Sequence, residues 1–203
     1  MKKEFKVINK ETMYPGFFNL DVYQVQHTLF AGGWSEVLTR ELFQRGNCVA
    51  VLLYDPDVDR VVIIEQFRMG PMAQPEVQER AWLLEIVAGA IEKGETAEEV
   101  AYRESEEEAG CVVKEMHLIN EFYTSPGGAS ERISLFYGRI KADEVGGIHG
   151  LDEEHEDILV STVSFDEAYA MIEDGRIESA IPIIAIQWLA LNKHKLVQHP
   201  VSS

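Results

Sequence analysis

Short runs rich in Val, Ile, Leu and Phe, bounded by Gly, Pro or Asp, recur along the chain and predict β-strands. The first part of the chain holds three of these runs, at 5–8, 20–29 and 36–43. The next two, at 48–54 and 61–66, flank Asp55-Pro56-Asp57 and predict a hairpin. Later runs predict strands at 82–87, 112–122, 132–140 and 157–163. The segment 69–80, which has two prolines and a glycine, predicts a loop.

Start and stop signals predict helices at 96–109, 164–174 and roughly 180–193. Thr96 followed by Glu99 is a capping-box pattern, and Gly110 supplies a left-handed stop. The second helix has the same signals, with Ser164 followed by Glu167 as the capping-box pattern and Gly175 as the stop. Strands mixed with a few helices predict an α/β (α+β) sandwich with an N-terminal β extension. We expect residues 1–45 to form that extension and 46–203 to form the main domain. Three strands alone are poorly stable, so the extension must pack on the body or on another subunit.

The charge of the chain excludes some classes of partner. It has 35 acidic and 18 basic residues, a net charge of −17, so we expect neither nucleic acid nor an anionic membrane surface as a partner. An acidic protein with an anionic substrate needs a divalent cation between them. No apolar run reaches membrane-spanning length, and Cys48 and Cys111 form no Cys-x-x-Cys motif. These features predict a cytoplasmic protein.

The predicted helix at 96–109 ends in an unusual concentration of acids. Glu104, Glu106, Glu107 and Glu108 lie in its last turns, where the helix dipole is already negative and each acid costs about 0.3–1 kcal/mol. Glu104 and Glu108 lie one turn apart on one face and repel each other. A solvated acidic face is the ordinary explanation of a Glu-rich helix. Carboxylates one turn apart at the wrong end of the dipole instead indicate a site for a hard divalent cation.

The residues around this helix resemble the Nudix box, the signature of hydrolases that split nucleoside diphosphates linked to another group. The fixed positions of the box are Gly89, Glu95, Arg103, Glu104, Glu107, Glu108 and Gly110. Two positions that are usually aliphatic hold Ser105 and Cys111, which are small enough to pack. The resemblance implies a Nudix-type α/β/α sandwich of mixed sheets.

The same resemblance implies roles for the box residues. Glu104 and Glu108 are similar to the principal metal ligands of the family, and the carbonyl of Ala88 is similar to a further ligand. Glu107 is similar to an additional ligand or supporting acid, and Arg103 to the residue that orients the acids. The metal implied is Mg²⁺, two or three ions per site, with Mn²⁺ as a substitute.

A second motif, Ser125-Pro126-Gly127-Gly128, resembles the mark of the ADP-ribose pyrophosphatase branch, although alone it could be an ordinary β-turn. Glycines at this turn, Gly128 among them, let backbone approach a ligand. In that branch Glu131 is similar to the acid that holds the terminal ribose. We identify the other substrate-binding candidates as arginines for phosphate or cross-subunit contacts and an aromatic ring for the adenine: Arg40, Arg45, Arg68 and Phe17.

A third tract, 146–157, combines three glycines with a run of acids. It could be a solvated flexible loop. In the ADP-ribose branch a similar loop closes over the pyrophosphate, and there Glu154 resembles the general base and Glu156 a further metal ligand. His155 is an alternative base that we place in solvent.

The resemblance as a whole implies Mg²⁺-dependent hydrolysis of ADP-ribose to AMP and ribose 5-phosphate by a homodimer. Two alternatives stay open. One is hydrolysis of another nucleoside-diphosphate sugar such as GDP-mannose. The other is a non-catalytic nucleotide sensor, although the intact box disfavours it.

Overall fold

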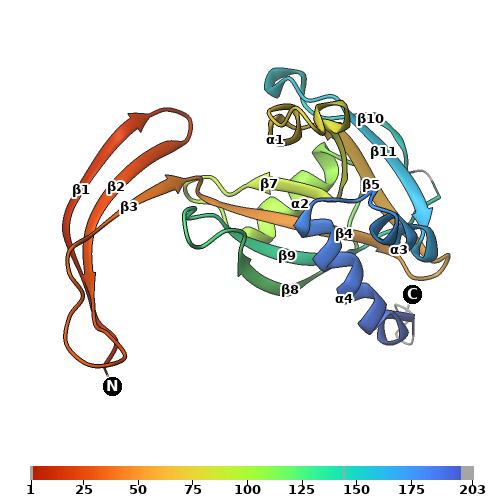
Figure 1. Ribbon diagram of the computed structural model, residues 1–203. Coiled ribbons are helices and arrows are strands. Elements are labelled where there is room, and N and C mark those ends of the chain that lie inside the picture. The colour runs from red at the N-terminus through yellow and green to blue at the C-terminus, as the bar shows by residue number, and fades with distance from the viewer. Residues whose placement is uncertain (1, 144, 198–203) are drawn as a thin grey trace. The chain divides into compact units, whose positions relative to one another are not determined.

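A computed structural model describes residues 2–143 and 145–197 (Figure 1). The chain divides into two compact units. One consists of Met1–Asn47 and Phe122–Ile133, and the other of Cys48–Glu121 and Ser134–Ser203. The division at residue 45 that we expect from the sequence stays a prediction.

The first unit contains a three-stranded antiparallel sheet in the order β1 (Phe5–Pro15), β2 (Asn19–His27) and β3 (Leu38–Gln44). Every side chain of β1 is exposed. This strand extends well beyond the predicted 5–8 because pairing with β2 continues through polar residues that carry no apolar pattern. The segment 122–133 joins the unit through Phe43, whose N–H donates to the carbonyl of Gly128 at 2.8 Å.

The second unit is built on an eight-stranded sheet. Its main path runs in the order β10 (Gly147–His149), β11 (Ile158–Ser164), β5 (Arg60–Phe67), β4 (Asn47–Asp55), β9 (Arg132–Arg139) and β8 (Glu115–Tyr123). Off this path, β6 (Trp82–Glu85) pairs with β5 and β7 (Val87–Ala90) pairs with β4. The single strand predicted at 82–87 is therefore broken at Ile86, where the chain leaves one partner strand for another.

Both strand directions occur in this sheet. β4 is antiparallel to β5 and β7. It runs parallel to β9, because Phe43 forms a parallel bridge with Ala129 just before these strands and the N–H of Ile140 donates to the carbonyl of Tyr54 at their far ends. The sheet is thus mixed, as predicted.

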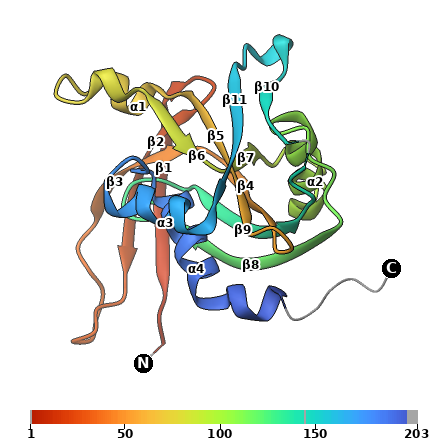
Figure 2. The same ribbon diagram turned by 90° about the vertical axis from the view of Figure 1, so that its right-hand side faces the viewer.

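Helices cover both faces of the sheet in the second unit (Figure 2). α2 (Ala97–Glu107) lies on one side, and α3 (Phe165–Glu173) and α4 (Ala180–Val197) lie on the other. The side chains of Val49, Val51 and Leu53 enter a core with those of Val100 and Ala101 from α2. On the opposite face the ring of Tyr137 lies 6.1 Å from that of Trp188 in α4.

Because both faces are covered, β4 is buried along almost its whole length, which explains its unbroken apolar run. This arrangement confirms the predicted α/β/α sandwich. Among the residues that the structure describes, no helix is both long and apolar enough to cross a membrane.

The three predicted helices are confirmed. The capping box predicted at the start of α3 is half formed, because Ser164 accepts from the N–H of Glu167 while the Glu167 side chain accepts from Arg176. Thr96 and Glu99 form the complete capping box of α2, and Gly110 and Gly175 have φ of +62° and +80° after their helices. Short elements lay outside the prediction: α1 (Met69–Met72), the 3₁₀ turns at Gln78–Arg80 and Asp152–Glu154, and β10. Each is too short to produce a readable periodicity.

Candidate metal and phosphate site

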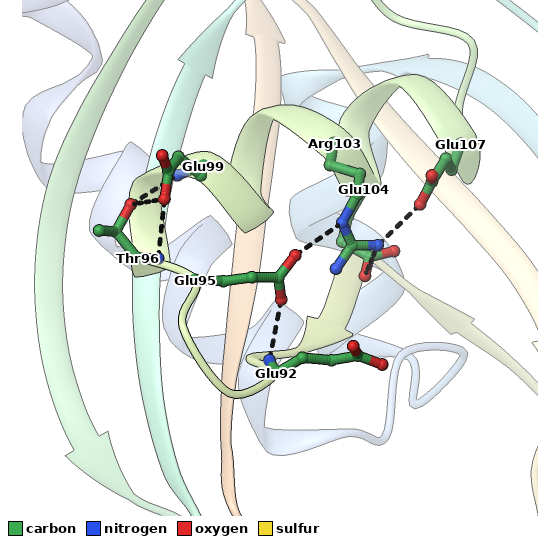
Figure 3. Close-up of polar contacts among 7 residues, drawn as sticks. All are labelled: Glu92, Glu95, Thr96, Glu99, Arg103, Glu104 and Glu107. Carbon is green, nitrogen blue, oxygen red and sulfur yellow. Dashed lines mark hydrogen bonds and ion pairs between the residues drawn. The ribbon is translucent and has the colours of Figure 1, made fainter.

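The loop before α2 is ordered by its own acids (Figure 3). Glu95 accepts a hydrogen bond from the N–H of Glu92 at 2.8 Å. Its other oxygen lies 3.3 Å from Nε of Arg103. Thus Glu95 connects the loop to the helix.

Arg103 binds three carboxylates at once. Besides Glu95, its Nη1 lies 2.9 Å from Oε1 of Glu104 and 2.8 Å from Oε2 of Glu107 (Figure 3). A guanidinium group presents donors in a fixed planar fork, so this geometry fixes the directions of the acids around it. The orienting role expected of Arg103 stays a prediction.

Glu104 and Glu108 lie on the inward face of α2, whereas Glu106 is exposed. Glu108 is only 2% exposed, and its Oε2 accepts a hydrogen bond from the N–H of Ala88 at 2.9 Å. The N–H and C=O of a strand residue point to the same side, so the carbonyl of Ala88 is directed toward Glu108 as well. This arrangement brings the backbone of Ala88 close to Glu104 and Glu108, the three groups that the resemblance implies as two principal metal ligands and a further one.

Burial raises the pKa values of both inward acids. The pKa of Glu108 rises to about 8, mainly by burial and only partly offset by the hydrogen bond from Ala88. Burial likewise raises the pKa of Glu104 to about 7, against the opposing effect of Arg103. The charge of Glu156 raises the pKa values of Glu104 and Glu108 further, so this residue of the acidic loop (residues 146–157) lies near them.

A group of three neighbouring carboxylates, two of them with raised pKa values, fits a hard cation, which prefers oxygen ligands. Their present hydrogen bonds turn them elsewhere: Glu104 to Arg103, Glu108 to Ala88 and Glu156 to the N–H of Leu151. Within 2–143 and 145–197, no three acid, His or Cys side chains are already arranged around one point as metal ligands. The donor set suits Mg²⁺, and binding requires rotation of these side chains.

Gly89 makes the close approach of β7 and α2 feasible. A Cβ atom at this position would overlap the carboxylate, Cδ and Cγ of Glu104. The glycine of the box is therefore required by space, because no larger residue leaves room for Glu104 in its present position.

A cationic group lies on the same side of the sheet. Nε of Arg68, just after β5, lies 2.7 Å from Oε2 of Glu85, and the charge of Arg68 lowers the proton affinity of Glu108. Gln66 lies two residues earlier on the same face of the strand. It is buried, and its Nε2 has no hydrogen-bond partner among the described residues. Arg68 thus places a positive charge near the acids, and its predicted contact with phosphate stays a prediction.

The acidic loop carries its two candidate acids differently. Glu156 is half-buried near Glu104 and Glu108, whereas Glu154 is exposed at the end of the 3₁₀ turn Asp152–Glu154. His155, which has a φ of +56°, is exposed, as we expected. The structure brings Glu156 to the carboxylates, whereas among the described residues no hydrogen bond or ion pair joins Glu154 to them.

Five of the predicted substrate-binding residues lie in the first unit, and four of them, all except Arg40, lie near one another. Nε of Arg45 lies 3.2 Å from Oε1 of Glu131, and its guanidinium group lies 4.9 Å from the centre of the Phe18 ring. The Phe17 ring, 95% exposed, contacts Phe18 edge-on at 4.7 Å. Gly128 has open space at its Cα and receives a hydrogen bond from Phe43.

Arg40 stands apart from this group. Its side chain is exposed, and its Nη1 donates to the backbone carbonyl of Thr39 at 2.8 Å. Its predicted contact with phosphate or a second subunit stays a prediction.

Glu85, Gln66 and the backbone of Gly150 were not identified from the sequence. Gly150 donates its N–H to the carbonyl of Glu107 at 3.2 Å. The sequence did offer a signal for Glu85 and Gln66. Each is a polar residue in or beside an apolar run, and a polar side chain in a buried strand needs a partner. Nothing in the sequence signals the backbone of Gly150.

Comparison with known proteins identifies the family. Residues 44–184 match the family model of the NUDIX domain. The chain is 46% identical over 197 residues to ADP-ribose pyrophosphatase of Haemophilus influenzae, covering 97% of this chain and 91% of the relative. It is 33% identical over 193 residues to GDP-mannose pyrophosphatase of Yersinia enterocolitica, covering 95% and 98%.

The fold is shared with a solved structure as well. A crystal structure of an ADP compounds hydrolase aligns with a TM-score of 0.67 over 93% of this chain and 96% of that chain, at 18% identity. At this identity the likeness shows the fold alone. The domain match and the nearly full-length relatives, together with the intact box on α2, show that the chain belongs to the Nudix family.

Proposed function

We propose that this protein hydrolyses the pyrophosphate bond of ADP-ribose, giving AMP and ribose 5-phosphate, with Mg²⁺ as cofactor. The observation that carries this proposal is the group of Glu104, Glu108 and Glu156, which is buried or half-buried and lies beside Arg68. Buried acids with too little positive charge around them favour the binding of a cation, and a bound cation favours the binding of an anionic pyrophosphate. The choice of ADP-ribose is supported by the relative from Haemophilus influenzae.

In the proposed site, Glu104, Glu108, Glu156 and the carbonyl of Ala88 hold two or three Mg²⁺ ions, for which Mn²⁺ can substitute. Bound Mg²⁺ supplies charge neutralisation on the pyrophosphate and lowers the pKa of a bound water. Arg103 restricts the orientations of Glu104 and Glu107 through the contacts described above, and Glu104 rotates away from Arg103 to bind metal. Glu107 supports the ligands.

Glu154 acts as the general base in this proposal. Its carboxylate accepts a proton from the attacking water while the water oxygen forms a bond to phosphorus and the bridging P–O bond breaks. Arg68 lies against a phosphate and offsets its charge. Its pairing with Glu85 leaves the other guanidinium nitrogens available for a phosphate contact.

The substrate's remaining groups are assigned to the first unit. Glu131 accepts hydrogen bonds from the terminal ribose hydroxyls, with Arg45 holding its other oxygen, and Gly128 lets the backbone approach. Phe17 stacks on the adenine, for which its high exposure is suitable. Arg40 contacts phosphate or a second subunit.

A homodimer formed through residues 1–45 is part of the proposal, and so is a cytoplasmic location. The dimer is supported by β1, which exposes Phe5, Val7 and Ile8 along a strand with no burial. Exposed apolar side chains that gather on one strand favour a surface that binds a partner. The acidic charge of the chain supports the absence of nucleic acid and of anionic membranes among its partners.

Hydrolysis of GDP-mannose is the second candidate, supported by the relative from Yersinia enterocolitica. The deciding experiment is incubation with a panel of nucleoside-diphosphate sugars, with Mg²⁺ and with EDTA, followed by chromatography of the products. We expect metal-dependent conversion of ADP-ribose to AMP and ribose 5-phosphate. Equal or faster turnover of GDP-mannose would favour the second candidate, and turnover of no member would favour a nucleotide sensor.

Replacing Glu154 tests the assignment of the base. We expect Glu154→Gln to lower kcat by about 10²–10⁴-fold with KM nearly unchanged, because only the proton acceptor is lost. Steady-state kinetics beside Glu153→Gln, an exposed neighbour in the same turn, measures this. A nearly wild-type Glu154→Gln with a large loss in Glu156→Gln or His155→Ala would contradict the assignment.

Replacing Glu108 tests whether the inward acids bind metal. Excess MgCl₂ should raise the melting temperature of the wild type above its value in EDTA. The free energy of unfolding should increase by about 2.7 kcal/mol when the Mg²⁺ concentration is a hundred times its Kd. Glu108→Gln should lose most of this increase together with activity. Thermal melts of both proteins check this, and equal Mg²⁺ shifts would mean that Glu108 is structural.

The same variant should alter the pH dependence of stability in EDTA. The folded pKa of Glu108, about 8, lies well above the ordinary pKa of a glutamate side chain, so the folded state binds more protons between these two pH values. Stability is therefore lost as pH rises through this range. Glu108→Gln should match the wild type near pH 5 and exceed it by at least ~1 kcal/mol at pH 8.5. Urea unfolding at both pH values measures the difference.

Gly89→Ala tests the close approach of β7 and α2. Its methyl group must displace Glu104, and a ligand displaced by about 1 Å can cost about 10²-fold in rate. We expect a loss of that order in kcat and a smaller Mg²⁺-dependent rise in melting temperature. Gly70→Ala, where the added methyl meets no atom within 4 Å, is the matched control. Full activity in Gly89→Ala would show that Glu104 has freedom to move.

A further inference from the structure

The end of α2 is completed by the acidic loop. Three of its last carbonyls, those of Glu104, Ser105 and Glu106, accept hydrogen bonds from Glu108, Cys111 and Gly110. The carbonyl of Glu107 accepts from the N–H of Gly150 at 3.2 Å. Helix ends leave carbonyls that need donors from outside the helix, and here a residue distant in sequence supplies one.

The residue before Gly150 packs against the same helix end. A Cβ added to Gly110, which follows α2, would lie 2.5 Å from Cε1 of His149. Nε2 of His149 donates to the carbonyl of Gly146 at 3.0 Å. His149 also ends β10, whose pairing with β11 fixes it opposite Ile158. The imidazole ring is therefore held between the glycine of the box and the start of the loop.

Gly150 connects this contact to Glu156. It has a φ of +102°, and a Cβ there would lie 2.6 Å from Cβ of Glu156. The N–H of Leu151 donates to Oε2 of Glu156 at 3.3 Å, and the N–H of Glu156 donates to the carbonyl of Leu151 at 3.2 Å. The loop thus folds back on itself, with Glu156 directly against the residue that is bonded to α2.

We propose that His149 and Gly150 are positioning residues, which dock the loop 150–157 on the end of α2 and so hold Glu156 beside Glu104 and Glu108. The proposal rests on the hydrolytic function proposed above. The backbone carbonyl of Glu107 accepts the hydrogen bond that anchors the loop, while the side chain of Glu107 binds Arg103. One turn of helix therefore aligns both groups of acids, those of the box and those of the loop.

The main test replaces His149 with Ala, beside Ile148→Ala as a matched control. Ile148 precedes it in β10 and is 74% exposed. We expect His149→Ala to lower kcat about 10-fold or more and to raise the half-saturating Mg²⁺ concentration about 10-fold, the usual size of effect for residues that support metal ligands. KM should change by no more than about twofold. The control should match the wild type in all three.

Rescue separates positioning from a general loss of stability. The amide Nε2 of His149→Gln can donate to the carbonyl of Gly146, so this variant should recover most of the activity. Gly110→Ala reaches the same contact from the helix side, since its methyl must push the imidazole away. Gly110 has a φ of +62°, which disfavours any Cβ, so Gly175→Ala, with a φ of +80° and no atom within 4 Å, is the control for backbone strain. Gly110→Ala should reproduce the rise in half-saturating Mg²⁺, and it carries the test where His149→Ala does not fold.

Hydrogen–deuterium exchange of the peptide 146–157, without substrate, tests the docking independently of turnover. The peptide should exchange faster in His149→Ala than in the wild type or Ile148→Ala, because the N–H of Gly150 loses its protection. A wild type that hydrolyses no nucleoside-diphosphate sugar would refute the function, and exchange would still decide the docking. Unchanged exchange and Mg²⁺ dependence in folded His149→Ala would overturn the proposal.

Discussion

The site depends on two carboxylates, Glu104 and Glu108, that α2 carries into the protein at its negative end. The helix dipole, their mutual repulsion and burial all oppose their charge. Arg103 and the N–H of Ala88 offset part of this cost, yet the pKa values of both acids remain raised to about 7 and 8. Burial of ionised groups with so little compensation is costly in free energy, and a bound cation removes the cost. Stability given up at such a position is typical of a site kept for function.

The sheet brings the other components to these acids. β7 pairs with β4 and so places Ala88 and Gly89 under α2, while β5 leads to Arg68 on the same side. β11 pairs with β5 and returns the acidic loop to the helix. Small residues are needed where these segments meet, because a side chain at Gly89 would occupy the space of Glu104.

Much of the fold could be predicted because its signals are local. The capping box of Thr96, the stop at Gly110 and the apolar run of β4 each depend on residues close in sequence, and the structure confirms them. The prediction was too short for β1, whose polar residues pair with β2 without an apolar pattern. β10 was missed because three residues carry no periodicity and its partner, β11, follows a loop.

The sequence by itself determined the family and the identity of the acids, because the box fixes residue types at fixed spacing along one helix and its loop. Only the tertiary structure decided that Glu104 and Glu108 face inward while Glu106 faces solvent, and that Glu156 joins them while Glu154 lies exposed. It also decided that Arg68 pairs with Glu85 and that Gly150 completes α2. Burial, proton affinity and the donors for a helix end are set by neighbours in space, and those neighbours come from strands and loops far apart in the chain.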